Sequence, residues 1–208
     1  MTVRLKLSKF FMKRNVLIVL FVLGVVGIGF GQQQSVGLRL GEPTGVVYKN
    51  YHNYRGAKGT AWELGFGTAS NSWNRGYYEN SFKDRGAYDG YHYTSHRVSG
   101  VVYFQGRYLF NYQIPTQGVD GRFDWYWGLG AVLKFANVKY AYQNDQPPFQ
   151  VATDTRTDID FGPEGILGAE YRFDHVPIIL FAEFSLMIEL ADRFGGRGFV
   201  GTGARYVF

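Results

Sequence analysis

The chain has 208 residues, no cysteine, 28 glycines and an aromatic fraction of 18%, whereas glycine averages about 7% of soluble proteins. Its formal net charge of +5 comes from five basic residues before position 16, and the rest of the chain carries 17 basic and 17 acidic residues. The composition therefore excludes a disulfide-stabilised fold, and the balanced charge predicts no nucleic-acid-binding patch.

The first 31 residues have the three-part layout of a secretory signal peptide. Residues 1–15 contain basic but no acidic side chains, and residues 16–30 form an unbroken apolar run that ends near the small residues Gly29 and Gly31. A retained membrane anchor is the alternative, but the run is short for a spanning helix of about 20 residues. We therefore expect a cleaved signal peptide over residues 1–31 and one domain over residues 32–208.

Eight segments of the remaining chain alternate between apolar residues and polar or small ones, which is the period-two pattern of β-strands. The clearest segment is residues 60–68, where Trp62, Leu64 and Phe66 share one face and Glu63 lies on the other. The pattern predicts strands at residues 33–41, 45–51, 60–68, 96–112, 123–135, 158–174, 178–190 and 198–208.

The connections between these strands differ in length. Residues 69–93 and 136–157 are polar or aromatic and are predicted to be long loops, while the other connections are short or moderate. An even number of strands, with long loops on one side and short turns on the other, is typical of bacterial outer-membrane barrels. The sequence therefore predicts an all-β fold, an eight-stranded antiparallel up-and-down transmembrane β-barrel.

The last predicted strand ends on an aromatic residue. Tyr206 and Phe208 lie on its apolar face. The terminal Tyr-Val-Phe resembles the carboxyl-terminal signal by which the outer-membrane insertion machinery recognises its substrates. We therefore expect Tyr206 and Phe208 to form an insertion signal.

The predicted inner face of the barrel carries charges of both signs. Eight strands leave an interior just wide enough for side chains to fill, and a charge there is costly unless it is paired. The near-balance of signs predicts a salt-bridged, closed lumen in which glycines make room for the long side chains; a narrow ion path or gated channel is the alternative. The predicted network consists of Arg39, Lys49, Glu63, Arg107, Lys134, Glu164, Glu170, Arg172, Glu183 and Arg205.

The long loops are candidates for surface binding, because exposed aromatic residues among polar ones can contact a partner. The alternative is that these residues belong to strands that extend past the membrane and pack on one another. The candidates are Trp73, Tyr77, Tyr78, Tyr88 and Tyr91.

Some eight-stranded outer-membrane barrels are lipid-modifying enzymes, and such chemistry needs a nucleophile within reach of a base. Ser95 and His96 are adjacent near the first long loop, but neighbouring residues of a strand point to opposite faces. His92 and His96 are four residues apart in an extended segment, which is not a helical metal pair. The sequence therefore predicts no catalytic residue, no metal ligand and no cofactor.

Four stretches, Gly37–Gly45, Trp125–Gly130, Gly162–Phe173 and His175–Ile178, carry a family resemblance. They resemble small eight-stranded outer-membrane barrels of Bacteroidota-type bacteria, which are relatives of the OmpA transmembrane-barrel and porin-family domains. Residues 184–190 depart from this family, whose members carry an Asp-Trp-Lys-Pro-like run there, so no role is carried over to that strand end. The resemblance implies the barrel fold and an outer-membrane location.

The expected role is structural or surface-interacting, with a small channel or transport accessory as the alternative and a lipid-modifying enzyme as a distant third. The expected partners are outer-membrane lipid and lipopolysaccharide, the insertion machinery, and a surface ligand that the sequence does not identify.

Overall fold

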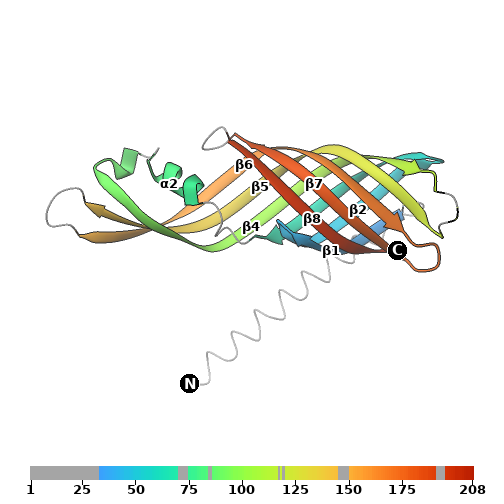
Figure 1. The fold of residues 1–208 in the computed structure, drawn as a ribbon, viewed down its shortest axis with the longest axis horizontal. Coiled ribbons are helices and arrows are strands. Elements are labelled where there is room, and N and C mark those ends of the chain that lie inside the picture. The colour runs from blue at the N-terminus through green and yellow to red at the C-terminus, as the bar shows by residue number, and fades with distance from the viewer. Residues whose placement is uncertain are drawn as a thin grey trace, which may run out of the picture. The chain divides into compact units, whose positions relative to one another are not determined.

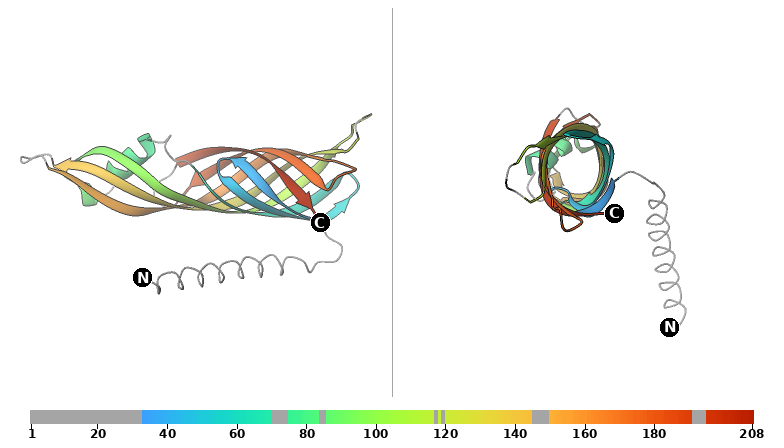
Figure 2. Two further views of the ribbon diagram at one scale, coloured as in Figure 1. Left: turned by 90° about the horizontal axis from the view of Figure 1, so that it is seen from below. Right: turned by 90° about the vertical axis from the view of Figure 1, so that its right-hand side faces the viewer.

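The computed structural model describes residues 33–69, 75–83, 86–116, 118, 120–144, 150–190 and 195–208, so the predicted signal peptide lies outside the described residues. The strands are β1 (Gln33–Gly41), β2 (Thr44–Arg55), β3 (Lys58–Thr68), β4 (Tyr91–Ile114), β5 (Arg122–Asn144), β6 (Val151–Arg172), β7 (Ile178–Glu189) and β8 (Gly195–Val207). All are antiparallel and pair in chain order, and β1 also pairs with β8, so the sheet closes into a ring (Figure 2). The predicted all-β, eight-stranded barrel is confirmed.

Three strands are longer than the alternation predicted. β4 begins at residue 91, β5 ends at residue 144 and β6 begins at residue 151. Most of the loop predicted at residues 136–157 is therefore strand, and that prediction was wrong. At this end the apolar side chains face inward, as at Ala136, Val138 and Tyr140, whereas the outward side chains are polar, as at Asn137 and Lys139. The prediction relied on apolar side chains on the outer face, and that signal ends here.

β4, β5 and β6 continue past the ring as a three-stranded sheet (Figure 1). The β3 ladder reaches β4 only as far as the Gly67–Tyr103 pair, and the β7 ladder reaches β6 only as far as the Glu164–Met187 pair. We call the part beyond these pairs the extension, which comprises residues 91–102 of β4, 136–144 of β5 and 151–163 of β6.

Two short helices, α2 (Arg75–Lys83) and η2 (Gly86–Tyr88), precede β4. They lie within residues 69–93, so the prediction of a loop was wrong for these positions. Tyr78 and Phe82 are four residues apart on α2 and both are buried, which gives the helix one apolar face. In the part of the chain that the structure describes, no helix has the length and apolar character needed to cross a membrane.

The outer face of the ring carries an apolar belt. On β7 every second side chain from Ile178 to Ile188 is exposed and apolar. Ten residue steps of about 3.3 Å, tilted by about 45°, give the belt a height of about 23 Å. This agrees with the apolar band of about 25 Å that surrounds outer-membrane barrels.

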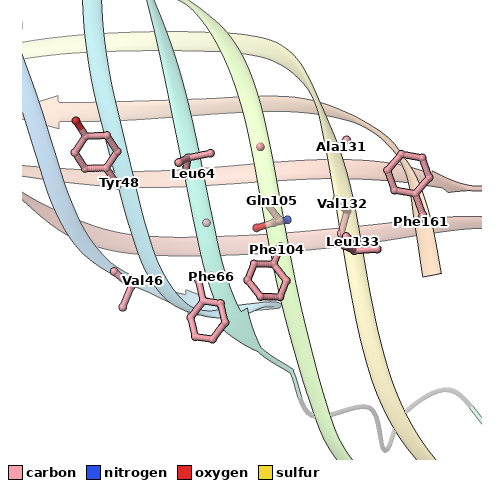
Figure 3. A pocket seen from close by; sticks show the side chains of 12 residues that line it. Val46, Tyr48, Leu64, Phe66, Phe104, Gln105, Ala131, Val132, Leu133 and Phe161 are labelled. Atoms are coloured by element: carbon pink, nitrogen blue, oxygen red, sulfur yellow. The ribbon is translucent and has the colours of Figure 1, made fainter. Parts of the chain in front are cut away.

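An apolar groove of about 530 Å³ interrupts this belt (Figure 3). Aromatic and aliphatic side chains line it, among them Phe66, Phe104 and Phe161. Gly106 contributes no side chain there, although a Cβ at this position would meet only Leu64 Cδ2, at 3.9 Å. Most of its lining side chains lie on the outer face of the wall, and Gln105 and Val132 of the inner face also line it.

Candidate functional site: the lumen and the extension

Buried charges of both signs fill the middle of the lumen, with Arg107 on β4 at their centre. Its guanidinium donates to Glu63 at 3.0 Å and to both Glu164 and Glu183 at 2.8 Å. Arg39 adds a second contact to Glu183 at 3.1 Å. Each of these five side chains belongs to a residue that is at most 5% exposed, so a single arginine partly neutralises three buried carboxylates.

The contacts continue from Glu63 to two further cations. Arg205 on β8 donates to the second oxygen of Glu63 at 2.6 Å and to Glu170 at 2.5 Å. Lys49 on β2 donates to the same oxygen of Glu170 at 2.9 Å. We call the connected set the lumen network, and its formal charge is zero because it joins four cations to four carboxylates: Arg39, Lys49, Arg107 and Arg205 with Glu63, Glu164, Glu170 and Glu183.

Neutral side chains supply further hydrogen bonds to these carboxylates. The hydroxyl of Tyr51 donates to Glu170 at 3.0 Å, and the hydroxyl of Tyr126 donates to Glu183 at 2.9 Å. A buried charge loses its hydration and is tolerated when pairing and hydrogen bonds replace the lost water. The lumen network meets most of that condition with groups from many strands of the ring, although Arg39 Nε and Arg205 Nε are buried without a hydrogen-bond partner among the described residues.

Apolar layers lie on both sides of the lumen network. Along the inner face of β4, Val101 and Tyr103 are followed by Gln105 and Arg107 and then by Leu109. The first two belong to the apolar cluster near the extension, and the last belongs to a second cluster toward the chain termini. That second cluster comprises Tyr51, Ala61, Leu109, Tyr126, Ile166 and Ile179.

Sequence reasoning missed these apolar layers, because it treated the inner face as polar. The available signal was on β7, where Ile179 and Phe181 interrupt the polar pattern of the inward positions. Both are buried, at 0% and 3% exposure. The lumen is therefore filled by apolar side chains as well as by ion pairs.

Two of the ten predicted lumen charges lie outside the network. Lys134 donates to Asp160 at 2.5 Å on the side of the extension, where Arg197 of β8 also lies 3.8 Å from Asp160. Arg172 is half-buried, donates to Gln33, and holds its guanidinium 5.1 Å from the ring centre of Tyr51. The structure brings the other eight predicted residues together.

Glycines leave room for the long side chains of the network. A Cβ at Gly201 would lie 2.3 Å from Arg39 Nε, and a Cβ at Gly130 would lie 2.8 Å from Arg107 Cγ. Real Cβ atoms do not approach other atoms this closely, so these positions require a residue without a side chain. The high glycine content thus has a specific cause in the narrow interior.

The predicted loop aromatic residues differ in their exposure to solvent. Tyr78 and Tyr88 are buried at 0% and 5% exposure, whereas Tyr91 is 42% exposed. Trp73 lies outside the described residues, as does the side chain of Tyr77. The burial of Tyr78 and Tyr88 fits the alternative in which the aromatic side chains pack on one another. These two residues are therefore not part of an exposed binding surface.

An aromatic cluster holds α2 and η2 against the extension. Phe82 of α2 stacks on Tyr88 of η2 with ring centres 4.2 Å apart, and it lies 5.8 Å from the ring of Tyr140 on β5. Aromatic pairs at such distances stabilise packing beyond the burial of their area. The helices therefore cover the inner face of the extension and leave its outer face exposed.

A polar contact also ties η2 to β6. Tyr88 OH donates to Asp154 Oδ2 at 2.9 Å, and Arg156 Nε donates to the same atom at 2.9 Å. The hydrogen bond from Arg156, followed by that from Tyr88, lowers the pKa of the Asp154 carboxyl. Burial and the bond to Asp154 raise the pKa of the Tyr88 hydroxyl. The carboxylate form of Asp154 thus favours the attached position of η2.

Ser95 and His96 take different environments on β4. Ser95 is exposed, whereas His96 is half-buried with its ring 4.5 Å from that of Tyr78. His96 Nδ1 lies 2.6 Å from the hydroxyl of Tyr93. Within the ranges that the structure describes, no group of three or more His, Asp and Glu side chains could hold a metal ion.

The carboxyl terminus takes part in closing the ring. Phe208 N donates to Gln34 O at 2.9 Å, and Gln34 N donates to Phe208 O at 3.3 Å. The side chains of Tyr206 and Phe208 remain 56% and 53% exposed. The two aromatic side chains are thus displayed on the outer face at the seam between β1 and β8.

Comparisons with known proteins agree with this architecture at the level of fold. No protein-family model and no curated protein matches the sequence. Among solved structures, the attachment invasion locus protein Ail of Yersinia pestis is 11% identical, with a TM-score of 0.51, over 85% of this chain and 97% of Ail.

Two further solved structures match at lower TM-scores. A major outer membrane protein from Thermus thermophilus is 12% identical over 86% of this chain and all of that chain, with a TM-score of 0.45. The N-terminal β-barrel domain of Pseudomonas aeruginosa OprF is 12% identical over 85% of this chain and 96% of that chain, with a TM-score of 0.41. The closed ring of eight strands and the similarity to Ail together show that the chain has the fold of the small eight-stranded outer-membrane β-barrels.

Proposed function

We propose that this protein is an integral outer-membrane barrel, exported by a cleaved signal peptide, with a closed lumen and a surface-interaction role for its extension. The observation that carries the closed lumen is the charge-neutral lumen network between two apolar layers. An ion in transit would have to displace paired charges and then enter apolar surroundings, and both steps are unfavourable. No catalytic role is proposed.

Planar-bilayer recording tests whether the lumen is closed. The purified wild-type barrel should add no conductance steps above the background of the bilayer, because the network and its apolar layers leave no continuous aqueous path. A porin inserted in the same lipid shows that the assay detects an open barrel. Reproducible single-channel steps from the wild-type protein would contradict the closed lumen and favour the small-channel alternative.

Cysteine labelling tests the proposed orientation, and the chain suits it because it has no cysteine of its own. Thr155 is exposed on the extension, and Thr116 is exposed in the turn between β4 and β5 at the opposite end. On intact cells, a membrane-impermeant maleimide should label Thr155→Cys and spare Thr116→Cys until the cells are lysed. The reverse pattern, or labelling of neither variant after lysis of the outer membrane, would contradict this placement.

Features of the outer face support the proposed lipid and assembly partners. Arg97 and Lys139 are both exposed and directly opposite each other in the β4–β5 ladder, beyond the belt residues Val102 and Phe135. Like charges in this position repel, and a phosphate group of lipopolysaccharide would relieve that repulsion. The exposed side chain of Phe208 supports a contact with insertion machinery, because it does not pack inside the barrel.

A further inference from the structure

One edge of the extension has no partner strand among the residues that the structure describes. β7 pairs with β6 from Glu164 to Arg172, and one further bond joins Leu190 N to Phe161 O at 2.9 Å. From residue 151 to residue 160, β6 is paired with β5 alone among the described strands. Within the described part of the chain, about ten residues of this strand therefore have one hydrogen-bonding edge open, at the end where β4, β5 and β6 pass beyond the ring (Figure 1).

The bond to Phe161 identifies the main-chain groups at this edge. In an antiparallel strand the N–H and C=O groups of alternate residues point to the same side, and the β5–β6 ladder has no register shift along this segment. The odd-numbered residues therefore present both their N–H and C=O groups to the open edge. Thr155 and Thr157 lie at its centre, and both are exposed.

The sequence of this edge favours pairing. Every odd-numbered residue from Val151 to Ile159 is β-branched, the remaining three being threonines, and β-branched residues are enriched in strands. The edge carries no proline or lysine, which commonly protect exposed edges. Its inward charges are Asp154, Arg156, Asp158 and Asp160, of which Asp154 and Arg156 form an ion pair with each other at 2.9 Å.

The opposite edge of the extension is built differently. The β4–β5 ladder contains two register shifts, between Tyr93 and Ser95 and between Val98 and Gly100. Such irregularities twist an edge away from regular pairing and are a common protection. One chain thus carries an irregular edge on β4 and an edge on β6 whose ladder is regular.

We propose that residues 151–160 of β6 dock an extended segment of another protein, which joins the extension as a fourth strand through main-chain hydrogen bonds. The proposal deepens the surface-interaction role and names its partner class. A second copy in the same membrane fits less well. Barrel strands tilt by about 40° from the membrane normal, so a two-fold axis along that normal would cross the two edges at about 80°.

A peptide-binding assay on the purified barrel in lipid nanodiscs tests the proposal. The probe is a fluorescent ten-residue peptide that alternates threonine with serine or valine. The matched control peptide has the same side chains with alternate main-chain nitrogens methylated, which removes the donors of one edge. The first peptide should bind, and the methylated peptide should bind at least tenfold more weakly. Equal binding of both peptides, or no binding of the first, would overturn the proposal.

Variants of the barrel locate the bound strand. Thr155→Pro removes an N–H group that faces the open edge while leaving the bonds to β5, and it should weaken peptide binding at least tenfold. Thr155→Ala keeps that N–H group and should bind within threefold of wild type. Unchanged binding to Thr155→Pro would place the peptide elsewhere and overturn the assignment.

Two outcomes separate this proposal from its alternatives. If Thr157→Cys forms a disulfide-linked dimer that no longer binds the peptide, the occupant is a second copy and the assignment to another protein fails. Because the assay uses purified barrel, it does not depend on cellular location. Binding that requires the Thr155 N–H group, combined with failure of the cysteine-labelling test, would retain the docking edge and reject the proposed placement.

Discussion

Arg107 shows at the scale of one residue how the barrel interior depends on a single cation. Replacement by leucine would leave three buried carboxylates without their shared partner, and loss of one partner from a buried pair typically costs about 3–5 kcal/mol. We expect Arg107→Leu to lower the free energy of unfolding by that amount in a denaturant titration of the folded barrel. Arg107→Lys keeps the charge but loses the planar set of donors, so it should fall between Arg107→Leu and wild type.

An Arg107→Leu barrel that unfolds at the wild-type denaturant concentration would contradict the importance of the lumen network. The exposed Arg97 on the same strand supplies the control, since Arg97→Leu removes the same charge without stranding a buried carboxylate. Its effect should stay within about 0.5 kcal/mol of wild type, as for most surface substitutions.

A second prediction at this scale concerns the stability of glycine-to-alanine variants. A methyl group at Gly201 would collide with Arg39 Nε, whereas one at Gly165 on the outer wall would meet no atom within 4 Å. Overpacking a filled interior costs about 1–3 kcal/mol, so Gly201→Ala should unfold at a lower denaturant concentration than Gly165→Ala. Equal stability of the two variants would show that Arg39 can move aside without loss.

At the residue scale, strand alternation is enough to say which face of the wall a charged side chain occupies. It placed eight residues in one buried network, because charged side chains at alternate positions of a barrel strand share the lumen. It did not place Arg172, which lies near a strand end beside Gln33. It also missed Arg197, because that residue was predicted to lie in the loop before β8.

At the scale of elements, the strands inside the apolar belt were predictable and the extension was not. Within the belt, outward side chains that contact lipid must be apolar, so apolar residues recur at every second position of the strand. Beyond it, water surrounds the outer face, so residues such as Lys139 and Thr155 carry no apolar signal. The spacing of Tyr78 and Phe82 was the one available indication of α2.

The contact between η2 and β6 should depend on pH. The lowered pKa of Asp154 means that its bonds to Tyr88 and Arg156 persist above the usual aspartate pKa of about 4. They are lost as the pH falls through the lowered value. Hydrogen exchange at residues 86–88 should therefore quicken, relative to the intrinsic rate, as the pH falls from about 6 through the lowered pKa of Asp154. Asp154→Asn removes the titrating group, so its exchange should lack this transition; a transition of wild-type size would assign the effect to another residue.

At the scale of the whole molecule, three stacked regions fill the barrel: an apolar layer, the lumen network and a second apolar layer. The ring itself follows from the number and alternation of the strands. The pairing of particular charges does not, because it depends on the stagger of the closed sheet, which brings Arg205 on β8 to Glu63 on β3 and Glu170 on β6. Each partner lies at least two strands away around the ring.

Because of this stagger, the ion pairs of the lumen can form completely only when the strands close in the correct register. Until β8 meets β1, Arg205 cannot reach Glu63 across the seam, so each of these two ions lacks one of its ion-pair partners. A slip of one residue would turn Arg205 outward, because each step reverses the face of a strand. Only the barrel in the correct register buries and pairs all eight ions of the lumen network. Intermediates with a shifted register are therefore electrostatically unfavourable, and separating β1 from β8 in the closed barrel costs free energy.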